Sequence, residues 1–274
     1  FDDTVEEFLR FTGYELDNAF EEKDFFTAVM KLDKSADIII RTRKDKANPF
    51  KIYNLNPKSE DMPNTRLETF VFECSDIHKY FDIQQKQNIK FMTEKILEFD
   101  NYYFIQTAPS HMLGISYGMI EWKSQNRNYQ NSTDLPLNFD FNFKKPDYLK
   151  NVGFFDHAAT RVRADERDAA IIEFMKVTNY DFSMAIYVKN FNSITNVARF
   201  EGPSFAMVFT SGIVPFKSLE ESGPTEKFIF NYGTRTHHLA FKTEHIEETF
   251  DNLAKDGMRY LIKLVGSPEQ GLKQ

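Results

Sequence analysis

The sequence predicts an α+β protein built from four copies of a β-α-β-β(-β) unit. Three observations support this prediction: a composition that can bury a core, a recurring pattern of helix, stop and strand, and a long polar stretch near the middle. The chain has 274 residues, 41% of them hydrophobic, and 29 are Phe. This composition is typical of one or two folded domains and argues against a disordered chain.

The recurring pattern is an amphipathic helix that ends at Gly or Asn and is followed by alternating residues of a strand. Gly and Asn tolerate the left-handed conformation that closes a helix. The four stops are separated by 75, 91 and 78 residues. The copies read GYEL (13–16), NIKF (88–91), NYDF (179–182) and GMRY (257–260).

Apolar stripes and alternating stretches define the elements within each copy. The helix stripes are Val5, Phe8 and Leu9; Ile77 and Phe81; Ile171, Phe174, Met175 and Thr178; and Ile246, Phe250 and Leu253. Strands are expected before the last three helices, at 66–74, 154–163 and 234–243. Strands are expected after the helices at 25–32, 36–43, 102–108, 111–122, 183–191, 204–216, 260–266 and 271–274.

The polar stretch over 123–151 is rich in Asn, Gln and Pro, which is typical of a linker. It divides the chain into residues 1–122 and residues 152–274, with two copies of the unit in each half. The first copy has no strand before its helix, and the last copy ends early. We therefore expect the first strand and the C-terminal end of the pattern to be missing.

The charge balance excludes several classes of partner. The chain has 34 basic and 41 acidic residues and a net charge of −7, which argues against nucleic acid or an anionic membrane. No run of about 18 apolar residues is present, and the N-terminal segment does not resemble a signal peptide. The single cysteine, Cys74, excludes an internal disulfide and predicts a reducing, cytoplasmic location.

Two histidines stand at matched positions of the repeat. His238 lies 19 residues before the stop at Gly257, and His157 lies 22 residues before the stop at Asn179. Both fall on the strand that precedes a helix, where imidazoles from paired strands can meet at a metal ion. A buried histidine bonded to backbone is the alternative for each. Thr69 takes the place of His238 in the second copy, so the N-terminal half lacks this ligand.

Two histidines, one carboxylate and open positions are typical of non-haem Fe(II) oxygen chemistry. We find no convincing carboxylate within the chain, and Glu269 is a weak candidate. The repeat predicts the third ligand after Gln274. His237, on the opposite face of its strand, is expected to have a structural or supporting role.

At these residues the sequence resembles the vicinal oxygen chelate superfamily, and most closely the 4-hydroxyphenylpyruvate dioxygenase family. GFFDHAATRVR (153–163) is similar to the first metal-histidine strand of that family and contains His157. HHLAFKTEHIEETFDNLAKDGMRYL (237–261) is similar to its second metal-histidine strand, with the helix and Gly that follow, and contains His238. The resemblance in organisation covers nearly the whole chain, whereas recognisable motifs are confined to the C-terminal half.

The resemblance implies tandem paired βαβββ modules that form two open mixed-sheet cups, glyoxalase/dioxygenase-like, with an inert N-terminal cup and a metal-binding C-terminal cup. It implies Fe(II) held by His157, His238 and a Glu after Gln274, with O2 as co-substrate. The implied substrate is a small, aromatic 2-oxo acid, decarboxylated and hydroxylated, with Ser204, Pro215 and Gln274 beside it. No catalytic residue beyond the metal ligands is implied. Related cups often associate, which implies a homo-oligomer.

The sequence departs from the family at several pocket positions. His237 replaces a Gln, Lys217 replaces an Asn and is expected to be exposed, and the segment SGPTEKF (222–228) lacks a clear pocket Gln. Two other metal-dependent activities of the same superfamily therefore remain open, ring cleavage and isomerisation. A metal-free ligand-binding protein is the alternative from a different class. No phosphate-binding loop, HExxH, CxxC or GxSxG motif is present.

Overall fold

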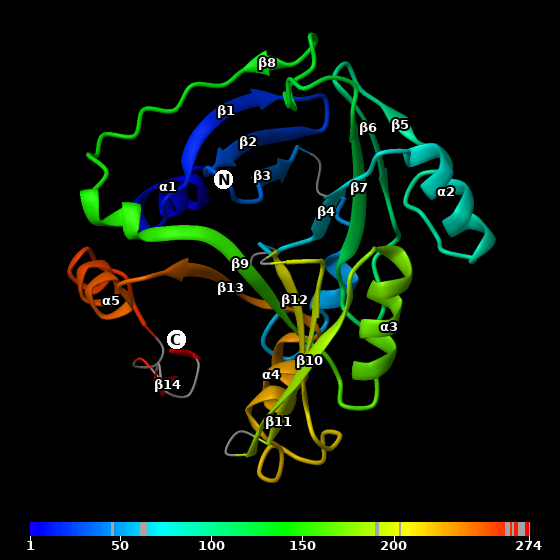
Figure 1. Cartoon of the computed structure of the whole chain (residues 1–274), viewed down its shortest axis with the longest axis vertical. Helices are drawn as coiled ribbons and strands as arrows, with labels where there is room; N and C mark the ends of the chain where they lie inside the picture. Colours follow the sequence, from blue (N-terminus) through cyan, green and yellow to red (C-terminus); the bar gives the residue numbers. More distant parts are fainter. Residues whose placement is uncertain are drawn as a thin grey trace. The chain divides into compact units, whose positions relative to one another are not determined.

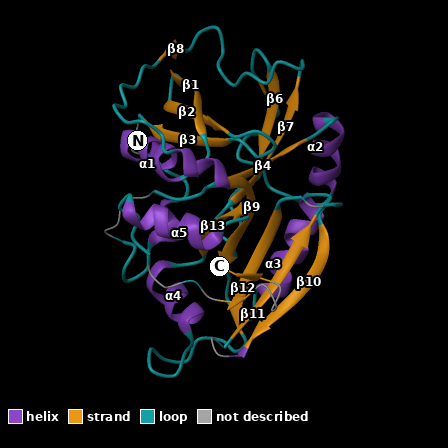
Figure 2. Ribbon diagram, turned by 60° about the vertical axis from the view of Figure 1, so that its left-hand side comes forward, coloured by secondary structure: helices purple, strands orange, loops and turns teal. Residues whose placement is uncertain are grey.

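The computed structural model describes residues 1–44, 47–60, 65–189, 192–202 and 204–260, together with 264, 266–267 and 272–273. The protein has the predicted α+β architecture, with helices packed on open, mixed sheets (Figures 1 and 2). The predicted helices are all present, and each begins or ends within a few residues of its apolar stripe.

The first module has α1 (Asp2–Phe11) followed by an antiparallel sheet. The strands β1 (Glu15–Glu21), β2 (Phe25–Lys31) and β3 (Ile38–Arg43) lie in the order β3-β2-β1. The short strand β8 (Leu135–Pro136) adds to the free side of β1. Buried residues of the helix and the sheet form one core cluster, consisting of Val5, Leu9, Tyr14, Ala19, Ala28 and Met30.

The second module shows the complete β-α-β-β-β order. It contains β4 (Thr69–Glu73), α2 (Ile77–Lys86), β5 (Leu97–Glu98), β6 (Tyr102–Gln106) and β7 (Ser116–Trp122). The strand order is β4-β7-β6-β5, and β4 runs parallel to β7. The first strand of the module therefore lies beside the last, with the helix as the crossover between the outer strands. A 3-10 helix, η1 (Lys51–Asn54), precedes this module.

The third module repeats this topology. Its elements are β9 (Val152–Arg161), α3 (Arg167–Val177), β10 (Asp181–Val188), β11 (Ser193–Arg199) and β12 (Ala206–Gly212). The sheet order is β10-β11-β12-β9-β13, and β9 pairs in parallel with β12. The predicted unit of strand, helix and three strands is therefore confirmed in two consecutive modules.

Helices cover both sides of β12. On one side, Phe174 of α3 packs against Phe209, with 5.7 Å between the ring centroids. On the other side, α4 (Pro224–Tyr232) approaches Gly212, where a Cβ atom would lie 1.4 Å from Glu226 Oε1. The two views agree that α3 and α4 lie on opposite sides of the strand (Figures 1 and 2).

The fourth module begins with β13 (Arg235–Thr243) and α5 (Ile246–Lys255). Two short strands, β14 (Gly266–Ser267) and β15 (Leu272–Lys273), pair in antiparallel fashion within the last two predicted strand segments. Glu269 and Gln274 lie outside the described residues.

The sequence analysis missed β11 and α4. The strand β11 contains polar residues that a buried central strand rarely carries, and neighbours satisfy them. Thr195 Oγ1 is 3.0 Å from Thr210 Oγ1, and Asn196 donates to Asp168 at 3.3 Å. These bonds make the polar residues compatible with the sheet interior.

The repeat extends beyond the residues at which the helices end, because further residues of the modules match at fixed offsets in the sequence. Phe8, Thr12 and Tyr14 have counterparts in Phe174, Thr178 and Tyr180, each 166 positions later. Likewise, Ile77, Phe81, Asp82 and Lys86 have counterparts 169 positions later in Ile246, Phe250, Asp251 and Lys255. The first module therefore matches the third, and the second matches the fourth.

The helix ends differ between these two pairs. Asn88 and Gly257 have the predicted left-handed conformation, with φ of 61° and 97°. The ends of α1 and α3 are extended instead, and the expectation for Gly13 and Asn179 was wrong. There Thr12 and Thr178 bond back to the carbonyls of Phe8 and Phe174, at 2.5 and 2.8 Å.

Gly13 is required for a different reason, because a Cβ at this position would lie 2.6 Å from the carbonyl oxygen of Val152. The backbone of the chain passes too close for a side chain. The glycine therefore marks close packing between two segments that are far apart in the sequence.

The predicted linker over 123–151 contains more structure than its composition indicates. Besides β8, it carries Leu137, Phe139, Phe141 and Phe143, which pack against the core cluster of the first module. The 3-10 helix η2 (Asp147–Asn151) follows directly before β9. Part of this segment therefore packs against the first module and belongs to its core.

The chain forms two compact units. One contains Phe1–Lys46, Thr133–Asp156 and Ala240–Gln274, and the other contains Ala47–Ser132 and His157–Leu239. The strands β9 and β13 each continue from one unit into the other. The division into 1–122 and 152–274 remains a prediction. Within the described ranges, none of the helices has the length and apolar character needed to cross a bilayer.

Candidate metal centre

The structure brings His157 and His238 together. His157 lies on β9 and His238 lies on β13, and these strands are neighbours in one sheet. The ring centroids are 5.6 Å apart, and the ring planes are nearly perpendicular, at 78°. The two histidines with matched repeat positions are therefore also adjacent in space.

His237 connects this pair to a guanidinium group. Its Nδ1 is 2.7 Å from Nδ1 of His238, and its Nε2 is 3.0 Å from an Nη atom of Arg161. Arg161 also donates to Thr225 Oγ1 at 3.0 Å, and its guanidinium lies 4.9 Å from the ring centre of Phe228. Together these contacts form a continuous polar chain from α4 to the two histidines.

The environment lowers the pKa of two of these imidazoles, those of His237 and His238. Burial, followed by the charges of His157 and Arg161, lowers the pKa of His238 to about 4. Burial, followed by the charges of Arg161 and His238, lowers the pKa of His237 to about 3. Both side chains also have exposed surface, so small molecules can reach His237 and His238. A neutral imidazole is the form that binds metal.

The geometry of the pair fits a shared metal ion. Two imidazole nitrogens bound at about 2.1 Å with a near-tetrahedral angle separate the ring centroids by roughly 5 Å. The separation of 5.6 Å is close to this value. Imidazole donors suit Fe, Zn, Ni and Cu. Among the described residues, no third His, Cys, Asp or Glu completes a metal-binding group.

The predicted substrate-side residues are not brought together. Ser204 precedes β12, and its hydroxyl donates to the carbonyl of Phe200 at 3.0 Å. Pro215 follows β12 in an exposed loop. A seven-residue strand spans about 20 Å, so the two residues lie at opposite ends of it. Gln274 lies outside the described residues, and Lys217 is exposed, as expected.

The sequence analysis missed Arg161 and Glu226. Arg161 follows His157 by four positions on β9, so both point to the same side of the sheet. Glu226 is only 4% exposed and belongs to the first turn of α4. The sequence feature that could have identified Arg161 is its position, an even number of residues after a candidate ligand on the same strand. No pattern in the sequence indicated that Glu226 is buried.

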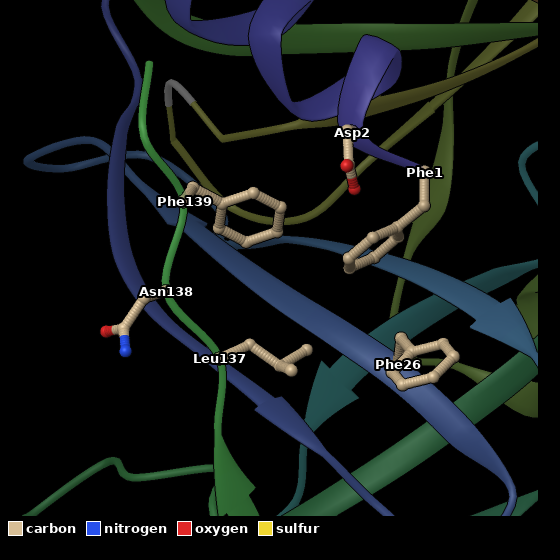
Figure 3. Close-up of a pocket in the computed structure, with 6 residues that line it drawn as sticks. All are labelled: Phe1, Asp2, Phe26, Leu137, Asn138 and Phe139. Atoms are coloured by element: carbon tan, nitrogen blue, oxygen red, sulfur yellow. The ribbon is translucent and has the colours of Figure 1, made fainter.

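Two hollows of the described surface are lined by other residues. One, with a volume of about 330 Å³, lies in the first module (Figure 3). Phe1, Phe26 and Phe139 face one another there, with Phe1 5.7 Å from Phe139. A second hollow, of about 590 Å³, includes Cys74 and Trp122. Neither hollow is lined by the histidines.

Two solved structures align with nearly the whole of this chain. A triple mutant of 4-hydroxymandelate synthase from Streptomyces coelicolor aligns with a TM-score of 0.64 and 12% identity, covering 96% of this chain and 74% of that one. A fusion of a xylose isomerase-like TIM barrel with 4-hydroxyphenylpyruvate dioxygenase aligns with a TM-score of 0.55 and 10% identity, covering 93% of this chain and 36% of that one.

These similarities, at 10 to 12% identity, establish the fold, which this chain shares with 4-hydroxymandelate synthase and with the 4-hydroxyphenylpyruvate dioxygenase fusion. No protein-family model matches the sequence. No curated protein matches it either. The resemblance predicted from the two histidine strands is confirmed at the level of the fold.

Proposed function

We propose that the chain belongs to a non-haem Fe(II) dioxygenase that acts on a small, aromatic 2-oxo acid. The observation that carries this proposal is the pair His157 and His238, adjacent on neighbouring strands of a dioxygenase-like fold. The matched repeat positions of the two residues support it further. The third ligand remains the Glu that the resemblance implies after Gln274.

The residues of this chain have defined tasks in such a reaction. His157 and His238 would hold the metal through neutral nitrogens, and the partly open side of the pair would leave room for substrate. When bound, Fe(II) would supply the affinity for the carboxylate and keto oxygens and the reactivity toward O2. Ser204 and Gln274 would orient the substrate, and neither nucleic acid nor a membrane is required as a partner.

Anaerobic Fe(II) binding tests the proposal directly. The full-length wild-type protein should bind about one iron, and His157→Ala and His238→Ala should each lower the affinity by at least about a hundredfold. His245→Ala is the matched control, because His245 is an exposed residue at the start of α5 without a side-chain capping bond. Absence of iron binding in the wild type would contradict the proposal and favour a metal-free binding protein.

Product analysis separates this activity from others on the same fold, because a fold alone does not define a reaction. Turnover of aromatic 2-oxo acids by the enzyme should consume O2 and release CO2 in equal amounts. Ring cleavage would consume O2 without CO2, and isomerisation would consume no O2.

A further inference from the structure

Three buried polar atoms near His237 have no hydrogen-bond partner among the described residues. They are Nε of Arg161 and both carboxylate oxygens of Glu226. Arg161 bonds to Thr225, the residue immediately before Glu226, and is influenced by the charge of Glu226. Among the described residues the guanidinium and the carboxylate nevertheless form no ion pair. A buried carboxylate without donors is costly, and such a group calls for an explanation.

The hydrogen bonds of Arg161 determine where the histidines carry their hydrogens. A guanidinium can only donate, so Nε2 of His237 must accept from Arg161. The hydrogen of neutral His237 is therefore on Nδ1 and is donated to Nδ1 of His238. Neutral His238 must then carry its hydrogen on Nε2.

This arrangement opposes metal binding. Nδ1 of His238 faces His237, so Nε2 is the nitrogen that is free to bind a metal. A ligand nitrogen needs a lone pair, which Nε2 lacks while it carries the hydrogen. If both histidines exchange tautomers, Nε2 of His237 carries a hydrogen that points at Arg161. Two donors would then face each other, and Arg161 would have to leave.

We propose that Arg161 exchanges partners when the site is filled, bonding to His237 without metal and forming an ion pair with Glu226 when His238 binds metal through Nε2. The proposal rests on the proposed function. Nε2 of His238 loses its hydrogen, and Nε2 of His237 gains one. The hydrogen between the two Nδ1 atoms moves from His237 to His238. The histidines keep two hydrogens in total. Arg161 and Glu226 are thus positioning residues for the metal ligand.

The exchange satisfies the atoms that lack partners in the structure. Arg161 can offer Nε together with an Nη atom to the two oxygens of a carboxylate, which is the geometry that guanidinium and carboxylate groups prefer. Gly212 leaves the space that the carboxylate of Glu226 occupies. Nε of Arg161 and the carboxylate of Glu226, which have no partners among the described residues, would therefore satisfy each other in this ion pair.

The tautomers can be read without activity. Long-range ¹H–¹⁵N spectra of the chain labelled with ¹⁵N-histidine should show hydrogen on Nδ1 of His237 and on Nε2 of His238. In Arg161→Met, His237 should lose this preference. Addition of Zn(II), a diamagnetic probe, should move the hydrogen of His237 to Nε2 in the wild type. Unchanged histidine tautomers in Arg161→Met would overturn the proposal.

Calorimetric measurement of the Zn(II) dissociation constant provides the second test. Substitutions at Arg161 and at Glu226 should change this constant in opposite directions. Arg161→Met should tighten the Zn(II) dissociation constant about tenfold, and Glu226→Gln should weaken it about tenfold. The controls are Arg163→Met and Glu221→Gln, which change exposed residues of the same types. In the double variant the effect of Glu226→Gln should disappear, because Arg161 is gone.

The double variant also guards against a simple loss of folding in Glu226→Gln. Equal affinities in wild type and single variants would overturn the partner exchange and leave the metal site intact. Absence of Zn(II) and Fe(II) binding in the wild type would overturn the proposed function together with this inference.

Discussion

The second and fourth modules share a helix signature but differ at one strand position. Ile77, Phe81 and Lys86 of α2 recur 169 positions later in α5, and the same offset takes Thr69 to His238. Thr69 of β4 accepts a hydrogen bond from Gln106 at 2.7 Å, whereas His238 of β13 stands beside His157. The repeated helix maintains the module, and the residue at the strand position differs between a threonine and one of the two adjacent histidines.

The first and third modules offer the same kind of comparison for stability. Both helices end with a threonine that bonds back to a phenylalanine carbonyl, and a buried tyrosine follows. Phe174 is fully buried, whereas Phe8 is only half-buried. Equivalent residues of the two modules therefore contribute differently to stability, and substitutions can measure the difference in the free energy of unfolding.

The largest expected effect is the loss of Phe174. It contacts the rings of Phe72, Tyr117, Tyr180 and Phe209, with centroids between 5.2 and 5.9 Å away. Phe174→Ala should lower the free energy of unfolding by about 3–5 kcal/mol through lost burial and a cavity. Denaturant unfolding of Phe8→Ala is the matched comparison. An equal loss in both variants would contradict the difference in packing between the modules.

The next effect concerns the position that distinguishes β4 from β13. His238→Thr places the residue of the second module in the fourth, and should weaken metal binding by at least about a hundredfold, or roughly 3 kcal/mol. Thr69→His should create no site, because the strand beside β4 is β7 and carries no histidine. Titration of both variants with Zn(II) checks this, and a second Zn(II) ion in Thr69→His would contradict it.

The tyrosines after the helices should respond differently to loss of the hydroxyl. Tyr14 Oη donates to the carbonyl of Ala36 at 2.6 Å and lies 2.7 Å from Ser35 Oγ. Tyr14→Phe should cost about 1–2 kcal/mol, because the buried tyrosine loses its hydrogen bonds to Ala36 and Ser35. Tyr180→Phe should cost less than about 0.5 kcal/mol, because its hydroxyl has no partner among the described residues. Unfolding of both variants at pH 7 provides the measurement.

Alkaline pH sharpens this comparison. Burial is the main cause that raises the pKa of Tyr14 to about 12, above its ordinary value of 10. The unfolded chain therefore releases this proton first, so the stability that Tyr14 contributes is complete below pH 10 and is lost as the pH rises through about 12. Between these values the wild type should lose stability faster than Tyr14→Phe. Parallel pH profiles of the two proteins would contradict this assignment.

The smallest effect concerns the threonines that close α1 and α3. Thr178→Val and Thr12→Val remove the hydroxyl and keep the side-chain shape, and each should cost about 1 kcal/mol. In both helices the hydroxyl also accepts from the backbone N–H of the following tyrosine, at 3.1 and 3.3 Å. Thermal unfolding should show similar shifts for the two variants, since the capping bonds are the same.

Much of the fold was predictable because it depends on local patterns. The apolar stripes of α1, α2, α3 and α5 and the alternating strands follow from the spacing of residues along the chain. The strand β11 was missed because its polar residues are satisfied by partners on neighbouring elements. Likewise, the aromatic residues of the predicted linker pack against a core cluster that local composition does not reveal.

The candidate site was predictable only in part. Repeat positions identified His157 and His238, because equivalent residues of a repeated module occupy equivalent places in the fold. Ser204 and Pro215 were expected beside the substrate; they lie before and after β12, and their role stays a prediction. Arg161 and Glu226 were missed, because the meaning of a charge depends on burial and on partners that lie far away in the sequence.

The sequence by itself determined the module, its repetition and the two histidines, since helix periodicity, strand alternation and repeat position are properties of residue order. The tertiary structure decided which side chains meet. It placed the two imidazoles 5.6 Å apart, joined them through His237 to Arg161, and buried Glu226 without a hydrogen-bond partner among the described residues. These contacts arise from strand pairing and helix packing between distant segments, which no local pattern encodes.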